Sequence, residues 1–236
     1  MKSLSDFRCE QIGDCTLILG DCLQVMPLLG EFDSLVTDPP YGMSFKSNYR
    51  KVSHKSIEND DTAGMLSYAC SLKPKHSSYI WMRWDNLSAI PKPKSLITWV
   101  KNNHSMGDLQ HEHGRKTEVA AFYAGPNHFF KKRPNDVVFA NRTGNELHPT
   151  QKPVSLMVEN VKWTNGEVVD PFMGSGTTGV ACAKLGRKFT GVELDEDYFN
   201  IACQRIEDAY KQGDLFVQPP KCRNRPEQMQ LLQGDL

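Results

Sequence analysis

The feature that most constrains the fold of this 236-residue chain is an alternation of strand and helix patterns between residues 167 and 211. Residues 167–170 predict a strand, a glycine-rich turn follows, and residues 177–185 predict a helix. A second strand at 189–194 and a second helix at 196–211 complete the run. This alternation is typical of a parallel sheet with crossover helices. We therefore expect an α/β fold with a mostly parallel, twisted sheet and helices on both faces.

The first half of the chain adds further elements. The sequence predicts strands at 15–19, 34–37, 78–84, 96–101 and 118–124, and helices at 21–29 and 63–72. Residues 34–37 are apolar enough for a strand that is buried on both faces. The polar residues 43–61 predict a mobile loop, and residues 216–236, rich in Pro, Gln and Arg, predict an irregular tail.

The formal net charge of zero conceals an uneven distribution of charge. Residues 43–147 carry 16 basic and 9 acidic side chains, whereas residues 1–42 carry 2 and 7 and residues 148–236 carry 10 and 12. A basic centre favours contact with a polyanion through one face, although an ordinary solvated surface explains the charges equally well.

Apolar runs are short throughout the sequence. The longest, Val119–Ala124, is six residues, whereas a membrane-spanning helix needs about 20. The first residues lack the apolar core of a signal peptide. We therefore expect a cytoplasmic protein without a membrane span.

The cysteine and histidine spacings argue against metal sites and disulfides. The seven cysteines are odd in number and form no CxxC pair, so we expect reduced, mostly buried side chains. His111-Glu112-His113 lacks the spacing of a zinc-binding helix. We expect no bound metal.

The glycine-rich turn Gly174-Ser175-Gly176-Thr177 follows one predicted strand and opens a helix. Glycines let the backbone turn tightly and approach a ligand closely. Glu193 ends the next strand, 17 residues after Gly176, where a carboxylate can accept both hydroxyls of a ribose. The pattern favours nucleotide binding. A P-loop is excluded because no Gly-Lys-Ser/Thr is present, while a dinucleotide-binding fold and a purely structural turn stay open.

The string Asp38-Pro39-Pro40-Tyr41 follows a buried strand, at the end where open α/β sheets bind ligands. The prolines fix φ and remove N–H donors, so this stiff turn presents acceptors: the Asp38 carboxylate and the Pro39 carbonyl. Two acceptors aimed at an amine on a heteroaromatic ring favour a pyramidal nitrogen with a localised lone pair, which can attack an electrophilic carbon. Tyr41 offers a ring on which a base can stack.

These motifs together resemble the amino-group DNA methyltransferases that use S-adenosylmethionine. The resemblance is carried by Asp38-Pro39-Pro40-Tyr41, by His148-Pro149-Thr150-Gln151-Lys152-Pro153 and by Asp170-Pro171-Phe172-Met173-Gly174-Ser175-Gly176. The tyrosine motif precedes the glycine motif by 132 residues, the order of the permuted β group. The resemblance covers most of residues 14–210, implies a Rossmann-like methyltransferase fold, and extends to small phage-type or orphan methylases.

The resemblance also implies residue roles within a catalytic domain spanning 1–215. Asp38, Pro39, Pro40 and Tyr41 would be catalytic and hold a flipped base. The residues that would bind S-adenosylmethionine are Asp21, Asp38, His148, Thr150, Gln151, Lys152, Asp170, Phe172, Met173, Gly174, Ser175, Gly176, Thr177 and Glu193.

The resemblance also bears on the substrate. Asp at the first position of the tyrosine motif favours adenine N6, whereas N4-cytosine enzymes more often carry Ser there. A C5-cytosine mechanism is disfavoured because none of the seven cysteines follows a proline. N4-cytosine, RNA or protein-amide methylation, a dinucleotide-dependent oxidoreductase and a non-catalytic DNA-binding regulator stay as alternatives.

The target-recognition region of this family would fall at about residues 125–147, which is short. Such a small region contacts few base edges, so we expect a short or relaxed target in double-stranded DNA. The candidate phosphate contacts are Lys46, Arg50, Lys51, Lys55, Lys131, Lys132, Arg133 and Arg142. Small members of the family often pair, so a homodimer is expected.

Overall fold

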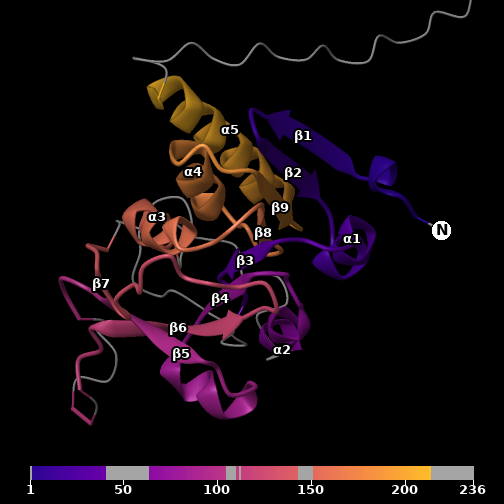
Figure 1. Cartoon of the computed structure of the whole chain (residues 1–236). Coiled ribbons are helices and arrows are strands. Elements are labelled where there is room, and N and C mark those ends of the chain that lie inside the picture. The colour runs from indigo at the N-terminus through magenta and orange to yellow at the C-terminus, as the bar shows by residue number, and fades with distance from the viewer. Residues whose placement is uncertain (1, 41–63, 105–109, 112, 143–150, 214–236) are drawn as a thin grey trace, which may run out of the picture.

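The computed structural model describes residues 2–40, 64–104, 110–111, 113–142 and 151–213. Within these residues, one nine-stranded sheet has the order β1-β2-β9-β8-β3-β4-β6-β5-β7 (Figure 1). The strands are β1 (Arg8–Ile12), β2 (Cys15–Leu19), β3 (Ser34–Thr37), β4 (Ser77–Met82), β5 (Ser95–Val100), β6 (Thr117–Ala124), β7 (Val137–Phe139), β8 (Val168–Asp170) and β9 (Phe189–Glu193).

Five of the eight neighbouring strand pairs are parallel, and the antiparallel pairs are β1–β2, β4–β6 and β5–β6. The α-helices are α1 (Cys22–Leu29), α2 (Gly64–Ser71), α3 (Val154–Lys162), α4 (Thr177–Lys184) and α5 (Glu196–Gly213), and short 3₁₀ helices span Leu4–Asp6 and Trp84–Ala89. The expected mostly parallel α/β fold is therefore confirmed.

The helices cover both faces of the sheet because its central strands, such as β3, β4 and β8, are buried on both sides. One buried cluster joins the sheet to α3, α4 and α5 through residues such as Leu156, Ala181 and Phe199. The other joins it to α1 and α2 through residues such as Val25 and Leu66. Figure 1 shows these two helix groups on opposite sides of the sheet.

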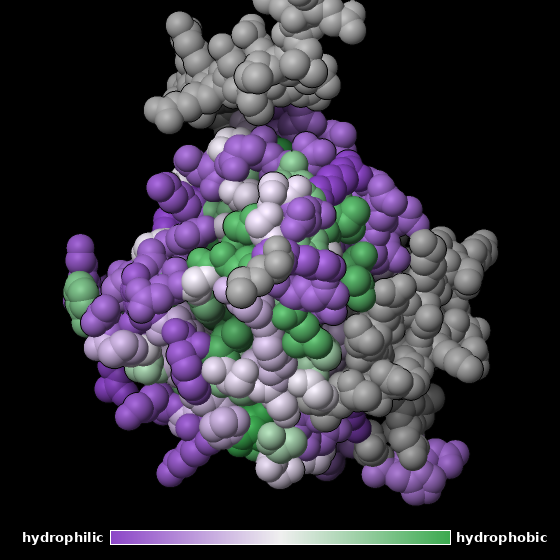
Figure 2. Space-filling model, turned by 90° about the vertical axis from the view of Figure 1, so that its right-hand side faces the viewer, coloured by the Kyte–Doolittle hydropathy of each residue, from purple (hydrophilic) through white to green (hydrophobic). Residues whose placement is uncertain are grey.

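The outer surface over α1 and α2 is mixed in character. Figure 2 shows apolar atoms reaching the surface in the middle of this face, with hydrophilic residues around them. Leu23 of α1, 45% exposed, is one of the exposed large apolar side chains. No helix in the described ranges is long and apolar enough to cross a membrane.

Three elements were not predicted from the sequence. β1 and β7 are short edge strands with mostly exposed residues, so their alternation signal is weak. α3 begins directly after Pro153, and its sequence Val-Ser-Leu-Met-Val-Glu-Asn-Val-Lys contains three β-branched valines. One prediction was wrong at its end: the strand expected at 78–84 stops at Met82, and Trp84 begins the 3₁₀ helix.

Candidate active site

The candidate site lies at the carboxyl edge of the parallel strands. In β2 and β9, Leu19 is in register with Glu193, and Asp170 of β8 is in register with Gly191 of β9. β3 runs parallel to β8, so Asp38 follows a strand that ends at the same edge. Turns distant in the sequence thus meet where open α/β sheets bind ligands.

The glycine turn has a backbone that only glycine adopts without strain. Gly174 has φ 51° and Gly176 has φ 79°, both in the left-handed region. Gly176 is the N-cap of α4, and a Cβ at this position would lie 2.8 Å from the Cβ of Ala202 in α5. The turn therefore packs directly on α5, and no side chain fits beneath it.

Glu193 holds the glycine turn from the end of β9. Its Oε2 accepts a hydrogen bond from the Gly174 N–H at 2.8 Å, and its Oε1 accepts from the N–H groups of Leu194 and Asp195 at 3.0 and 2.9 Å. Burial raises the pKa of Glu193 to about 7, although the backbone donors act in the opposite direction. The carboxylate accepts hydrogen bonds, as contact with a ribose requires.

Asp170 joins the glycine turn to the strand that precedes Asp38. Its Oδ1 accepts from the Thr37 hydroxyl at 2.6 Å and from the Phe172 N–H at 3.1 Å, and its Oδ2 accepts from the Thr178 hydroxyl at 2.7 Å. Burial raises the pKa of Asp170 to about 6 despite these donors. The hydrogen bond from Thr37 of β3 to Asp170 of β8 therefore fixes the segment after β3 relative to the glycine turn.

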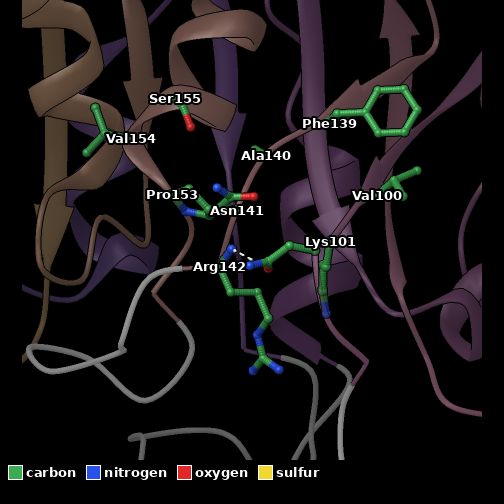
Figure 3. Close-up of a pocket in the computed structure, with 10 residues that line it drawn as sticks. Val100, Lys101, Phe139, Ala140, Asn141, Arg142, Pro153, Val154 and Ser155 are labelled. Carbon is green, nitrogen blue, oxygen red and sulfur yellow. Dashed lines mark hydrogen bonds between the residues drawn. The ribbon is translucent and has the colours of Figure 1, made fainter.

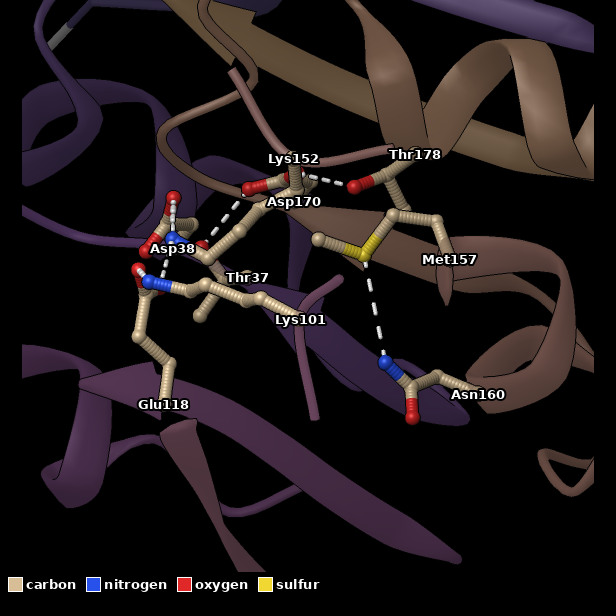
Figure 4. A network of polar contacts seen from close by, with 9 residues as sticks. All are labelled: Thr37, Asp38, Lys101, Glu118, Lys152, Met157, Asn160, Asp170 and Thr178. Atoms are coloured by element: carbon tan, nitrogen blue, oxygen red, sulfur yellow. Dashed lines mark hydrogen bonds and ion pairs between the residues drawn. The ribbon is translucent and has the colours of Figure 1, made fainter. Parts of the chain in front are cut away.

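Asp38 takes part in an ion-pair network with three other side chains (Figure 4). Lys152 Nζ lies 2.5 Å from Asp38 Oδ2 and 3.2 Å from Glu118 Oε2. Lys101 Nζ contacts Glu118 Oε1. Burial raises the pKa of Asp38 to about 6, although the charge of Lys152 opposes the rise.

Some of the remaining expected catalytic and cofactor-binding residues lie in the described ranges, and others do not. Asp21 is the N-cap of α1, and its side chain accepts a hydrogen bond from the Leu23 N–H at 2.9 Å. Pro39 is buried, and Pro40 and Gln151 are half-buried. Tyr41, His148 and Thr150 lie outside the described residues.

Lys152, which was expected to line the cofactor pocket, lies between two carboxylates. Its ammonium group contacts the carboxylates of Asp38 and Glu118 directly. It therefore links the segment before α3 to Asp38 and to β6. Sequence reasoning did not single out Glu118, which lies within β6, or Lys101, which directly follows β5, because one charge in or after an apolar strand carries no distinctive signal.

A third residue that the sequence analysis did not identify is Arg205 of α5. Its Nη1 donates to the backbone oxygen and the hydroxyl of Ser175 at 2.5 and 2.8 Å and contacts Thr177 Oγ1 at 3.3 Å. Arg205 therefore stabilises the glycine turn through hydrogen bonds from α5. A basic residue on an amphipathic helix carries no sequence signal for this role.

An open cleft of about 600 Å³ lies beside the ion-pair network, between the ends of β5 and β7 and the start of α3 (Figure 3). Lys101 and Arg142 line it, and Figure 3 shows both side chains extending toward the same end. Asn102 Oδ1 accepts a hydrogen bond from the Arg142 N–H at 3.2 Å. The exposed ring of Phe139 lines another part of the cleft.

The other candidate DNA contacts are only partly described. Lys131, Lys132 and Arg133 are exposed, as phosphate contact requires. Lys46, Arg50, Lys51 and Lys55 lie outside the described residues. Among the tryptophans, Trp81 and Trp99 are buried against each other, whereas Trp84 is 60% exposed.

Metal and disulfide chemistry find no support in the described ranges. No group of three or more His, Cys, Asp or Glu side chains there could hold a metal ion. The six described cysteines are free; four are buried, Cys203 is half-buried and Cys9 is exposed.

The fold and the joined turns define the class of protein, a nucleotide-binding methyltransferase with a Rossmann-like sheet. The structure of the M1.HpyAVI complex with S-adenosylmethionine is similar to this chain, with a TM-score of 0.62 and 26% identity over 81% of this chain and 99% of that one. The cytosine-N4-specific PvuII DNA methyltransferase shares the fold, with a TM-score of 0.59 and 17% identity over 86% and 93% of the two chains.

Sequence relatives define the family. A family model described as DNA methylase, of the N6/N4 type, matches residues 130–204. The putative methylase YubD of Escherichia coli (strain K12) is 32% identical over 218 residues, which cover 83% of this chain and 93% of that protein. The chain belongs to the S-adenosylmethionine-dependent amino-group DNA methyltransferases.

The residues of the site fit S-adenosylmethionine as the cofactor of this family. The glycine turn provides backbone on which a Cβ would collide with α5, and Glu193 provides carboxylate oxygens at the end of the next strand. Membership of this family argues against the two alternatives from other classes, a dinucleotide-dependent oxidoreductase and a non-catalytic DNA-binding regulator.

Proposed function

We propose that the protein transfers a methyl group from S-adenosylmethionine to N6 of an adenine flipped out of double-stranded DNA. The observation that carries this proposal is the hydrogen bond between Thr37 and Asp170, which joins the Asp38 turn to the glycine turn at one edge of the sheet. Asp at position 38 favours adenine, following the family pattern. N4-cytosine is the second candidate, because the PvuII enzyme, whose fold is similar, is cytosine-N4-specific.

In the proposed reaction, the Asp38 carboxylate and the Pro39 carbonyl accept hydrogen bonds from the two N–H groups of the target amine. The ring of Tyr41 stacks on the extruded base, whose removal from the duplex costs a few kcal/mol. S-adenosylmethionine supplies the methyl group as a sulfonium donor. When bound there, it would give this methyl group to the amine nitrogen and leave as the neutral thioether, and the surplus proton of the amine would pass to water. No covalent enzyme intermediate forms, and positioning supplies much of the acceleration.

Mass spectrometry of nucleosides tests the choice of base. Plasmid DNA from a methylation-deficient host is incubated with the purified protein and S-adenosylmethionine, digested to nucleosides and analysed. We expect N6-methyladenine. N4-methylcytosine would move the assignment to the second candidate, and unmodified DNA with methylated RNA or protein would exclude both DNA reactions.

The short segment near residues 125–147 predicts limited reading of sequence. Part of it forms β7 at the edge of the sheet, which leaves still fewer residues to contact base edges. We expect sequencing of methylated positions across a genome to return a target of few specified base pairs, or a relaxed one. A long, tightly specified target would contradict this prediction.

The raised pKa values predict a loss of activity on mild acidification. The reaction needs Asp38 as an acceptor, and burial raises the pKa of Asp38 to about 6. The active, ionised form is therefore complete well above pH 6 and declines as the pH falls through 6. We expect the rate of methyl transfer at saturating substrates to fall about tenfold per pH unit below that point. An acid limb near pH 4, typical of an ordinary carboxyl group, would disagree.

The homodimer expected from the family stays a proposal. Sedimentation velocity of the purified protein, with and without a short DNA duplex, measures it directly. A species of twice the 26.7 kDa chain mass is the expected result.

A further inference from the structure

Four charged side chains of alternating sign form a chain that ends at the candidate catalytic carboxylate. In order they are Lys101, Glu118, Lys152 and Asp38 (Figure 4). They come from four separate parts of the sequence: the end of β5, the strand β6, the segment before α3 and the turn after β3. Only the tertiary structure brings them together.

The two inner members of the chain each contact two opposite charges. Glu118 contacts both lysines, through Oε1 to Lys101 and through Oε2 to Lys152 at 3.2 Å. Lys152 contacts both carboxylates. The four formal charges cancel, which is the condition under which buried charges are tolerated.

Burial makes these contacts different from surface ion pairs. The side chain of Lys152 is 4% exposed and that of Lys101 is 6% exposed. Removing two charges from water costs several kcal/mol per ion, and apolar residues of similar volume often give equal stability. Stabilisation of the fold therefore does not explain why these four charges are buried together. Control of Asp38 does explain why the row of charges ends at that carboxylate.

We propose that Glu118 and Lys101 are positioning residues for methyl transfer, acting on Asp38 through Lys152. Glu118 holds the Lys152 ammonium group from the side opposite Asp38, so that the ammonium group fixes Asp38 Oδ2 without neutralising the carboxylate fully. Asp38 then presents an ionised acceptor in a fixed orientation to the target amine. This inference rests on the proposed function of Asp38 as the acceptor at the target amine.

The charges around Asp38 predict how each member affects its titration. Lys152 and Lys101 favour the ionised form of Asp38, whereas Glu118 disfavours it, and Asp170 of the neighbouring strand interacts with Asp38 as a like charge. Burial alone would raise the pKa of Glu118, but the charges of Lys152 and Lys101 lower it to about 2. Glu118 therefore stays ionised wherever Asp38 titrates.

Opposite pKa changes follow for variants of the two inner residues. Glu118→Gln removes a like charge from the surroundings of Asp38 and a competing carboxylate from Lys152, so the pKa of Asp38 falls. Lys152→Gln removes the nearest opposite charge, so the pKa of Asp38 rises. Each change is expected to be roughly one unit, the size produced by a charge within a few ångströms. Lys101→Gln acts from further away and produces a smaller rise.

The experiment measures the Asp38 carboxyl carbon by NMR across pH in the protein alone, with the signal assigned by its loss in Asp38→Asn. The pH dependence of kcat is recorded in parallel. We expect the acid limb of kcat to move with the NMR titration, downward for Glu118→Gln and upward for Lys152→Gln. At its optimum pH, Glu118→Gln is expected to lower kcat about 10- to 100-fold through misplacement of Asp38, with KM for S-adenosylmethionine nearly unchanged.

Glu159→Gln is the matched control. Glu159 also pairs with a lysine, Lys162, at 2.6 Å, but the pair is exposed on α3. This variant should change neither the titration nor kcat. If Glu118→Gln fails to fold, the smaller upward change in Lys101→Gln carries the test.

Two results would overturn the inference. One is an unchanged Asp38 titration and kcat in the folded Glu118→Gln and Lys101→Gln variants, and the other is a change of the same sign in Glu118→Gln and Lys152→Gln. The NMR titration needs neither DNA nor cofactor. A wild-type protein that transfers no methyl group would therefore refute the proposed function, while the titration would still decide whether the charge chain controls Asp38.

Discussion

Asp38→Ala is expected to abolish methyl transfer while binding of S-adenosylmethionine survives. The variant removes the acceptor at the target amine, and loss of one preorganised electrostatic contact to a transition state costs on the order of 100- to 1000-fold in rate. The glycine turn keeps its own support, because Glu193 and Asp170 hold it through contacts that do not involve Asp38.

The structure also indicates that this variant folds. Lys152 keeps its contact with Glu118 at 3.2 Å when Asp38 is removed, so its buried ammonium group retains a partner. Tritiated-methyl transfer measures activity, and isothermal calorimetry measures cofactor binding. Glu159→Ala, at an exposed ion pair, controls for the loss of a carboxylate elsewhere. Normal transfer by Asp38→Ala would remove Asp38 from the reaction.

Gly176→Ala is expected to have the second largest effect, on cofactor binding and on stability together. At φ 79° an alanine is strained by roughly 1–2 kcal/mol. Its Cβ would also lie 2.8 Å from the Cβ of Ala202, and overpacking of this kind costs about 1–3 kcal/mol. The turn must move away from α5, which displaces the backbone expected to contact the cofactor. We expect affinity for S-adenosylmethionine to fall at least about tenfold, since 1.4 kcal/mol corresponds to that factor.

Gly186→Ala separates strain from collision. Gly186 has φ 60°, and no atom lies within 4 Å of the position of an added Cβ. This variant should be destabilised only by the backbone strain, and it should bind the cofactor as the wild type does. Thermal unfolding with and without S-adenosylmethionine gives both quantities. Equal cofactor affinity in Gly176→Ala and the wild type would show that the turn does not hold the cofactor.

Local patterns determined most of the sheet. The predicted strands at 15–19 and 34–37 coincide with β2 and β3, because short apolar runs between turn residues carry a clear signal. β1, β7 and α3 escaped prediction for the opposite reason: the exposed edge strands lack an apolar face, and the valines in α3 weaken a helical interpretation. The end of β4 was misplaced because Trp84 continues the apolar pattern after the strand has ended.

The sequence by itself determined the two turns, their residue types and their order along the chain, because proline fixes its own φ and glycine permits the left-handed backbone that other residues avoid. Those motifs were sufficient to indicate the family. Only the tertiary structure decided that Asp170 accepts a hydrogen bond from Thr37 and that Lys152 contacts Asp38. It also revealed Glu118, Lys101 and Arg205, which carry no motif. The role of a buried charge depends on which groups it contacts. Here those groups come from segments far apart in the sequence, and only the packing of the whole sheet brings them together.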